Sequence, residues 1–125
     1  RFYRYHKNEQ FAPHFDGCFR WNTRDQTHYT FIIYLNDGFE GGETTFFPGN
    51  INSMWTTKFQ RPEYKVNPKR GAALVFRHTG TNSPYHEGSP HTTDGKCKYA
   101  LRSDVAYTLT PPEQTQPAQQ QSNEN

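Results

Sequence analysis

Long apolar runs are missing from this chain of 125 residues, and none approaches the roughly 20 apolar residues of a membrane helix. Apolar residues do not recur at helical spacing over several turns, which argues against a helical bundle. Only 31% of the residues are hydrophobic, whereas aromatic residues make up 16%. Few aliphatic residues lie outside 31–35 and 72–76, so we expect a largely aromatic core.

An excess of charge of one sign is also missing. The 14 basic and 12 acidic residues give a formal net charge of +2. A nucleic-acid-binding protein usually shows a basic face or stripe, so no nucleic-acid partner is predicted. The two cysteines, Cys18 and Cys97, are too few for a disulfide framework and lack the clustered spacing of a zinc site. They could form one bridge or remain free thiols.

The start of the sequence shows no signal peptide. The chain opens at Arg1, without Met, and residues 1–6 already alternate like a strand. We therefore interpret it as a fragment or trimmed chain whose targeting segment could be missing. The compartment (cytoplasm or endoplasmic reticulum) and the oligomeric state stay open.

Nine Gly and nine Pro residues divide the chain into short segments, which is typical of an all-β domain with at most a minor helix. Residues 28–35 form the clearest strand, because they are β-branched and aromatic and end at an Asn-Asp-Gly turn. Polar loops are expected at 17–27, 49–62 and 78–97. The expected strands are 1–6, 11–16, 28–35, 43–47, 63–66, 72–77 and 98–109. This pattern predicts a sandwich, barrel or jelly roll, and a jelly roll has an open mouth between its sheets.

The composition changes at Thr110, after which Pro, Gln, Ser, Asn and Glu predominate. Such a segment cannot bury enough apolar surface to offset the entropy lost on ordering. We therefore predict one domain with a catalytic core at 1–110 and a disordered tail at 111–125.

His14 and Asp16 are two residues apart, which on an extended strand puts both side chains on one face, about 7 Å apart along the backbone. They could bind one metal ion, although an isolated His-x-Asp pair more often lies in a turn. His86 is the best candidate for a third ligand, because it precedes a final strand that could return to the first. Two His and one carboxylate form the facial set of non-haem Fe(II) oxygenases, which leaves coordination positions open. The histidines that could replace His86 are His6, His28, His78 and His91.

The final strand alternates between two kinds of side chain. One face carries Lys98, Ala100, Arg102, Asp104 and Ala106, and the other carries Tyr99, Leu101, Ser103, Val105 and Tyr107. The small residues on the charged face leave room for a ligand, and its cations could pair with a dicarboxylate. A half-exposed edge strand with a solvated charged face would show the same alternation, and the pattern alone slightly favours that interpretation.

Six segments, in their order and spacing, resemble the prolyl 4-hydroxylase branch of the 2-oxoglutarate- and Fe(II)-dependent dioxygenases. They are 11–16 (Phe-Ala-Pro-His-Phe-Asp), 34–37 (Tyr-Leu-Asn-Asp), 41–48 (Gly-Gly-Glu-Thr-Thr-Phe-Phe-Pro), 71–76 (Gly-Ala-Ala-Leu-Val-Phe), 86–88 (His-Glu-Gly) and 98–102 (Lys-Tyr-Ala-Leu-Arg). The resemblance spans about residues 3–107. It implies a double-stranded β-helix, which is a variant of the jelly roll.

The resemblance also implies an activity. It implies His14, Asp16 and His86 as ligands of Fe(II), with 2-oxoglutarate and O2 as cosubstrates and ascorbate as reductant. The implied reaction hydroxylates a C–H bond, first of all in a peptidyl proline, and converts 2-oxoglutarate to succinate and CO2. A different residue or a small molecule stays open as substrate. Two other functions also stay open: a non-catalytic jelly-roll binding module, and a cupin-type metal enzyme that uses no keto acid.

The resemblance further implies a basic residue on the final strand that pairs with the distal carboxylate of 2-oxoglutarate. Strand register favours Lys98, and Lys96 is the alternative. Arg102 would support the same carboxylate or face the substrate. Tyr5 and Tyr34 match family tyrosines whose hydroxyls reach the cosubstrate, and a core position explains each ring equally well.

The loops expected around the mouth of the jelly roll carry four candidate substrate contacts: Trp21, Trp55, Arg77 and Tyr85. A hydrophobic cap or an interface would explain these side chains equally well.

Overall fold

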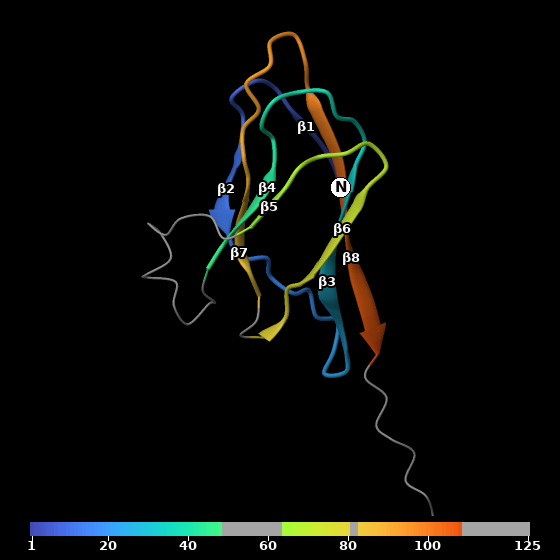
Figure 1. Cartoon of the computed structure of the whole chain (residues 1–125). Helices are drawn as coiled ribbons and strands as arrows, with labels where there is room; N and C mark the ends of the chain where they lie inside the picture. The colour runs from blue at the N-terminus through green and yellow to red at the C-terminus, as the bar shows by residue number, and fades with distance from the viewer. Residues whose placement is uncertain (49–63, 81–82, 109–125) are drawn as a thin grey trace, which may run out of the picture.

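The computed structural model describes residues 1–48, 64–80 and 83–108 (Figure 1). The strands in these ranges are β1 (Phe2–Tyr5), β2 (Phe11–His14), β3 (Asp25–Tyr34), β4 (Thr44–Phe47), β5 (Tyr64–Val66), β6 (Ala73–Arg77), β7 (Tyr85–Gly88) and β8 (Lys98–Thr108). The described part of the chain contains no helix that could cross a membrane. The predicted loop at 49–62 and the predicted tail at 111–125 lie outside the described residues.

The eight strands form two antiparallel sheets. The first sheet has the order β1-β8-β3-β6 and the second has the order β2-β7-β4-β5. Except between β4 and β5, each strand is followed along the chain by a strand of the opposite sheet. Figure 1 shows β2, β4, β5 and β7 on one side and β3, β6 and β8 on the other. This arrangement confirms the predicted double-stranded β-helix of the jelly-roll type.

β3 is longer than its composition predicts. It begins at Asp25 rather than at residue 28, and its first residues pair with the end of β8, starting at Asp25↔Thr108. The Thr108 hydroxyl donates to the Asp25 carboxylate at 2.5 Å. These polar residues form a strand because β8 satisfies their backbone groups, which local composition does not reveal. The predicted loop at 17–27 is therefore wrong at its C-terminal end.

The predicted loop at 78–97 is wrong at β7. Tyr85 is the one strand-favouring residue of this strand, which follows Pro84 and ends at Gly88, so its local strand signal is weak. β7 nevertheless lies inside the second sheet, paired with β2 on one side and β4 on the other. Tertiary pairing alone makes it a strand, and it carries His86.

The interior between the sheets is more polar than the predicted aromatic core. The buried hydrophobic residues in the described ranges are Tyr34 and Ala100, whereas the other buried side chains are Thr, His, Ser, Asp and Lys. On β8, Lys98 is buried while Leu101 and Val105 of the opposite face are exposed. β8 lies between β1 and β3. The edge-strand interpretation is therefore wrong, and the charged face of β8 points inward.

Gly41 provides a close approach between the turn before β4 and the segment after β7. Its φ is +79°, and a Cβ there would lie 2.6 Å from the backbone oxygen of Pro90. Gly71 has nearly the same φ, +82°, but a Cβ there would meet nothing within 4 Å. At both positions an L-residue would have to adopt an unfavourable left-handed backbone. Only at Gly41 would its Cβ also clash with a neighbouring backbone atom.

We expect Gly71→Ala to lower the free energy of unfolding by about 1–2 kcal/mol, the cost of a left-handed L-residue. Gly41→Ala should lose more, because the backbone of Pro90 must also move. Urea unfolding of both variants measures the difference. Equal losses would contradict the close approach at Gly41.

Candidate metal centre

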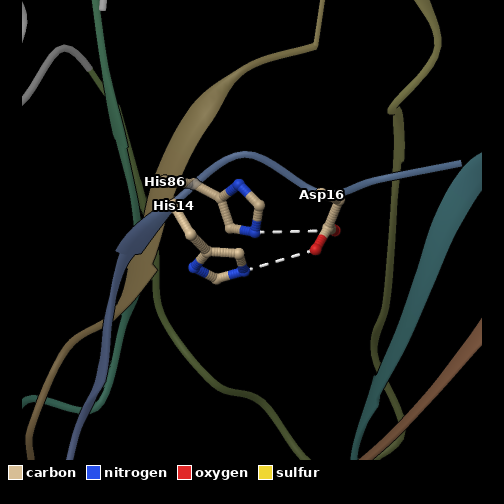
Figure 2. Close-up of side chains that lie close together, drawn as sticks. All are labelled: His14, Asp16 and His86. Carbon is tan, nitrogen blue, oxygen red and sulfur yellow. Dashed lines mark ion pairs between the residues drawn. The ribbon is translucent and has the colours of Figure 1, made fainter.

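The second sheet brings two histidines side by side. His14 is the last residue of β2 and pairs in register with His86 of β7. Asp16 follows β2 by two residues and turns toward both imidazole rings (Figure 2). One nitrogen of each ring and one carboxylate oxygen lie within 4.8 Å of one another. The three ligands expected from the sequence therefore lie together, two on strands and one on the chain just after a strand.

Each histidine presents the same nitrogen to the carboxylate. Nε2 of His14 lies 3.3 Å from Oδ1 of Asp16, and Nε2 of His86 lies 3.7 Å from Oδ2. Nδ1 of His14 faces the carbonyl oxygen of Ala12 at 2.8 Å, and Nδ1 of His86 faces that of Pro84 at 3.1 Å. A carbonyl oxygen only accepts, so each Nδ1 carries a proton and each neutral ring keeps its Nε2 lone pair free for a metal.

The environment keeps these groups in the protonation states that a metal ion requires. Burial lowers the pKa of His86 to about 4, against a smaller opposing effect of its bond to Pro84 and of Asp16. Burial alone would raise the pKa of Asp16, but its contacts with His14 and Thr30 and the neighbouring cation of Arg102 outweigh it and hold that pKa well below its usual range. At neutral pH His86 is neutral and Asp16 is ionised. Two imidazoles and one carboxylate with these properties fit a ferrous ion.

A cavity next to these three side chains contains every residue predicted to bind the cosubstrate. It is lined by Tyr3, Tyr5, Phe11, His14, Asp16, Ile32, Tyr34, Thr44, His86, Glu87, Gly88, Lys98, Ala100 and Arg102. Lys98 is 4% exposed, and its Nζ lies 5.3 Å from the ring centroid of Tyr5 and 5.9 Å from that of Tyr34. Its Nζ donates to the carbonyl oxygen of Gly42 at 2.7 Å. The cavity thus has a candidate metal end and a cationic end.

Lys98 and Lys96 differ sharply in their surroundings. Lys96 is exposed, donates to the carbonyl oxygen of Gly38 and does not line the cavity. Burial lowers the pKa of Lys98 to about 8, partly opposed by the charge of Glu43. A buried cation that pairs with no carboxylate among the described residues suits an anionic ligand.

Arg102 and the two tyrosines take different positions in the cavity. Nη2 of Arg102 lies 2.9 Å from Oδ1 of Asp16 and 3.6 Å from Oδ1 of Asp104, so Arg102 contacts the candidate metal end. Burial and the neighbouring Tyr3 raise the pKa of Tyr5 to about 12, against a smaller effect of Arg102. The Tyr5 hydroxyl therefore stays protonated at neutral pH.

Tyr34 is both a core ring and a cavity residue. It is 1% exposed, and its hydroxyl hydrogen bonds to the Thr44 hydroxyl at 2.7 Å. The core position considered for Tyr34 from the sequence is thus compatible with a place in the wall of the cavity.

Most of the other candidates do not reach this cavity. Arg77 is exposed on β6 and donates to the Thr79 hydroxyl. Tyr85 packs on Phe15 and Phe47 rather than lining the cavity. Trp21 is 58% exposed, and Trp55 lies outside the described residues. Cys18 and Cys97 are free thiols.

Sequence reasoning missed Thr30, whose hydroxyl donates to Oδ2 of Asp16 at 2.5 Å. Thr30 looks like an ordinary β-branched strand residue in the sequence. Only its position on the interior face of β3, fully buried opposite Asp16, distinguishes it.

Asp16→Asn should abolish tight Mn²⁺ or Fe²⁺ binding, because a neutral amide replaces the only carboxylate of the three-residue set. Asp94→Asn is the matched control, since Asp94 is exposed and pairs with Lys7 on the surface. Titration of Mn²⁺ followed by electron paramagnetic resonance measures both dissociation constants. Unchanged Mn²⁺ binding in Asp16→Asn would rule out this centre.

Comparison with known proteins supports the fold and identifies the family. A family model described as the 2OG-Fe(II) oxygenase superfamily matches residues 1–103. Among curated proteins, none matches the sequence significantly. A Pseudomonas putida prolyl-4-hydroxylase has a similar structure, with a TM-score of 0.54 and 22% identity, over 82% of this chain and 47% of that one. A viral collagen prolyl hydroxylase from Paramecium bursaria Chlorella virus-1, solved as a 2OG complex, gives a TM-score of 0.57 and 22% identity, over 85% of this chain and 59% of that one.

These findings differ in what they show. At 22% identity the two solved structures show a shared fold, and the chain spans only about half of their length. The family model matches residues 1–103, a range that includes the three candidate ligands and Lys98. It confirms the resemblance inferred from the six sequence segments. The chain belongs to the 2OG-Fe(II) oxygenase superfamily.

Proposed function

We propose that this chain is the catalytic core of an Fe(II)- and 2-oxoglutarate-dependent dioxygenase that hydroxylates a C–H bond. In the overall reaction, one atom of O2 enters the new hydroxyl group and the other enters succinate, while 2-oxoglutarate loses CO2. The observation that carries the proposal is one cavity that joins His14, Asp16 and His86 to the buried cation of Lys98. The complete three-ligand set argues against a non-catalytic binding module.

The three ligand side chains would hold the ion on one side only. The ferrous ion, when bound, supplies the electrons that activate O2. His14 and His86 would offer their Nε2 atoms from adjacent strands, and Asp16 would offer a carboxylate oxygen from the following segment. Three protein ligands leave room for a keto acid and for O2.

The opposite end of the cavity would hold the second carboxylate of 2-oxoglutarate. Lys98 supplies the positive charge there, and a charge-assisted hydrogen bond in such a site is worth about 1.5–3 kcal/mol. The hydroxyl of Tyr5, which remains protonated, lines the same cavity and can donate to this ligand. A keto acid held at both ends would be fixed in orientation, which is the main contribution that protein side chains make.

A peptidyl proline is the proposed substrate. The support is the pair of similar structures, which are named as a prolyl-4-hydroxylase and a collagen prolyl hydroxylase. The test is a proline-containing peptide incubated with the full chain, Fe²⁺, 2-oxoglutarate and ascorbate, beside a peptide with alanine in place of proline. A mass increase of one oxygen atom in the proline peptide alone supports this substrate.

Succinate formation separates the three functions. We expect succinate from the full chain and none from Asp16→Asn, while Asp94→Asn remains active. A binding module would take up 2-oxoglutarate without releasing succinate. A cupin-type enzyme would not bind 2-oxoglutarate. Either result in the unaltered chain would contradict the dioxygenase.

The binding of 2-oxoglutarate should weaken as pH rises above about 8, because burial lowers the pKa of Lys98 to that value. Below it the ammonium is charged and pairs with the carboxylate; above it the charge is lost, at a cost of up to about tenfold in affinity per pH unit. Calorimetry with the Mn²⁺-loaded chain between pH 7 and 9 measures the dissociation constant.

Lys98→Arg is the matched control, because a guanidinium stays charged over this range. Its affinity should vary little with pH, whereas Lys98→Met should bind weakly throughout. A pH dependence that persists in Lys98→Arg would assign the titration to another group.

A further inference from the structure

Resting on the proposed function, we propose that Thr30 and His78 are positioning residues that hold the carboxylate of Asp16 in its orientation toward the metal ion. Neither residue belongs to the three-ligand set, and His78 reaches Asp16 through Thr30. Both act through a row of buried hydrogen bonds that ends on Oδ2 of Asp16.

The row of hydrogen bonds is continuous. The Thr30 hydroxyl donates to Oδ2 of Asp16 at 2.5 Å and lies 2.8 Å from Nδ1 of His78. Nε2 of His78 lies 2.9 Å from the Thr27 hydroxyl, which accepts from the backbone N–H of Phe19 at 2.9 Å. Thr30 is fully buried, and His78 and Thr27 are nearly so. Water therefore cannot readily replace these bonds.

Counting protons gives each bond a direction. The single hydroxyl proton of Thr30 goes to the carboxylate, so Thr30 must accept from His78, and the His78 proton lies on Nδ1. In the neutral ring Nε2 is then an acceptor, and the Thr27 hydroxyl donates to it. The bonds thus run in one direction, from Thr27 through His78 and Thr30 to Asp16.

The fold explains why these residues meet. Thr27 and Thr30 are three residues apart and would face opposite sides of a regular strand. The register of β3 against β8 shifts between Thr27 and Tyr29, so the extra residue turns both threonines inward. His78 follows β6, and its backbone N–H donates to the carbonyl oxygen of His28 at 2.9 Å, which fixes it next to β3.

The two oxygens of Asp16 have different partners. Oδ2 accepts the short bond from Thr30, and Nε2 of His86 is 3.7 Å from it, beyond hydrogen-bond distance. Oδ1 lies 3.3 Å from Nε2 of His14 and accepts from Arg102 at 2.9 Å. Each oxygen thus accepts one hydrogen bond and keeps a lone pair for a metal ion. Thr30 on one oxygen and Arg102 on the other fix the plane of the carboxylate, and His78 in turn fixes the Thr30 hydroxyl.

Two matched pairs of variants test this proposal, with Mn²⁺ and Co²⁺ as probes in the full chain. Thr30→Val removes the hydroxyl at constant shape, and Thr30→Ser retains it. His78→Gln moves the polar group toward Nε2, and His78→Asn keeps a donor near Nδ1. We expect 10–100-fold weaker Mn²⁺ binding and a changed Co²⁺ visible spectrum in Thr30→Val and His78→Gln. Thr30→Ser and His78→Asn should stay close to the unaltered chain.

Equal Mn²⁺ affinity and an unchanged Co²⁺ spectrum in Thr30→Val would overturn the proposal, as would a loss in Thr30→Ser as large as in Thr30→Val. Nitrogen-15 NMR of the His78 ring in the unaltered chain is a second test that needs no variant. A proton on Nδ1 is expected, and a proton on Nε2 alone would also overturn it. Failure of the unaltered chain to bind Mn²⁺ would instead disprove the metal site, and with it the proposed function.

Discussion

Asp16 is only 7% exposed. An ionised carboxylate that is removed from water to this extent destabilises the fold unless other groups compensate for the lost hydration. That compensation comes from both sheets: the histidines of β2 and β7 lie on one side, and Thr30 of β3 and Arg102 of β8 lie on the other. The same contacts lower the pKa of Asp16 and fix the orientation of its carboxylate oxygens. The candidate metal site and one set of contacts between the two sheets therefore depend on one ionised group.

Polar side chains surround Asp16 in the interior between the two sheets. Threonines, histidines and one lysine occupy positions that aliphatic residues would fill in a simple sandwich. Each polar side chain there costs desolvation, and several are compensated by a specific partner, as with Tyr34 and Thr44 or Lys98 and Gly42. Nε2 of His28, Oγ of Ser83 and Nδ1 of His91 have no hydrogen-bond partner among the described residues. This polar interior explains how a chain with 31% hydrophobic residues can form a jelly roll and why so few of its apolar side chains are buried.

The local sequence predicted a strand correctly where its own residues favour strands. It failed where only pairing with neighbouring strands makes a segment a strand. β3 and β6 follow from β-branched residues between turns, and the two-residue spacing of His14 and Asp16 suggested a shared face. β7 could not be predicted, because Tyr-His-Glu-Gly becomes a strand only between β2 and β4. Thr30 was missed for the same reason, and His78 was considered only as a replacement for His86, since a register shift and the strand pairing of β3, not sequence spacing, bring them to Asp16.

β8 pairs with β1 and β3 at once, and its alternation puts Lys98 and Arg102 inside and Tyr99 and Leu101 outside. Sliding this strand by one residue would turn both cations to solvent and bring two bulky side chains between the sheets. A misaligned β8 would therefore displace Lys98 from the cavity, break the ion pair between Arg102 and Asp16 and disturb the packing between the sheets. The stability of the fold and the geometry of the candidate site thus depend on the same alignment of β8.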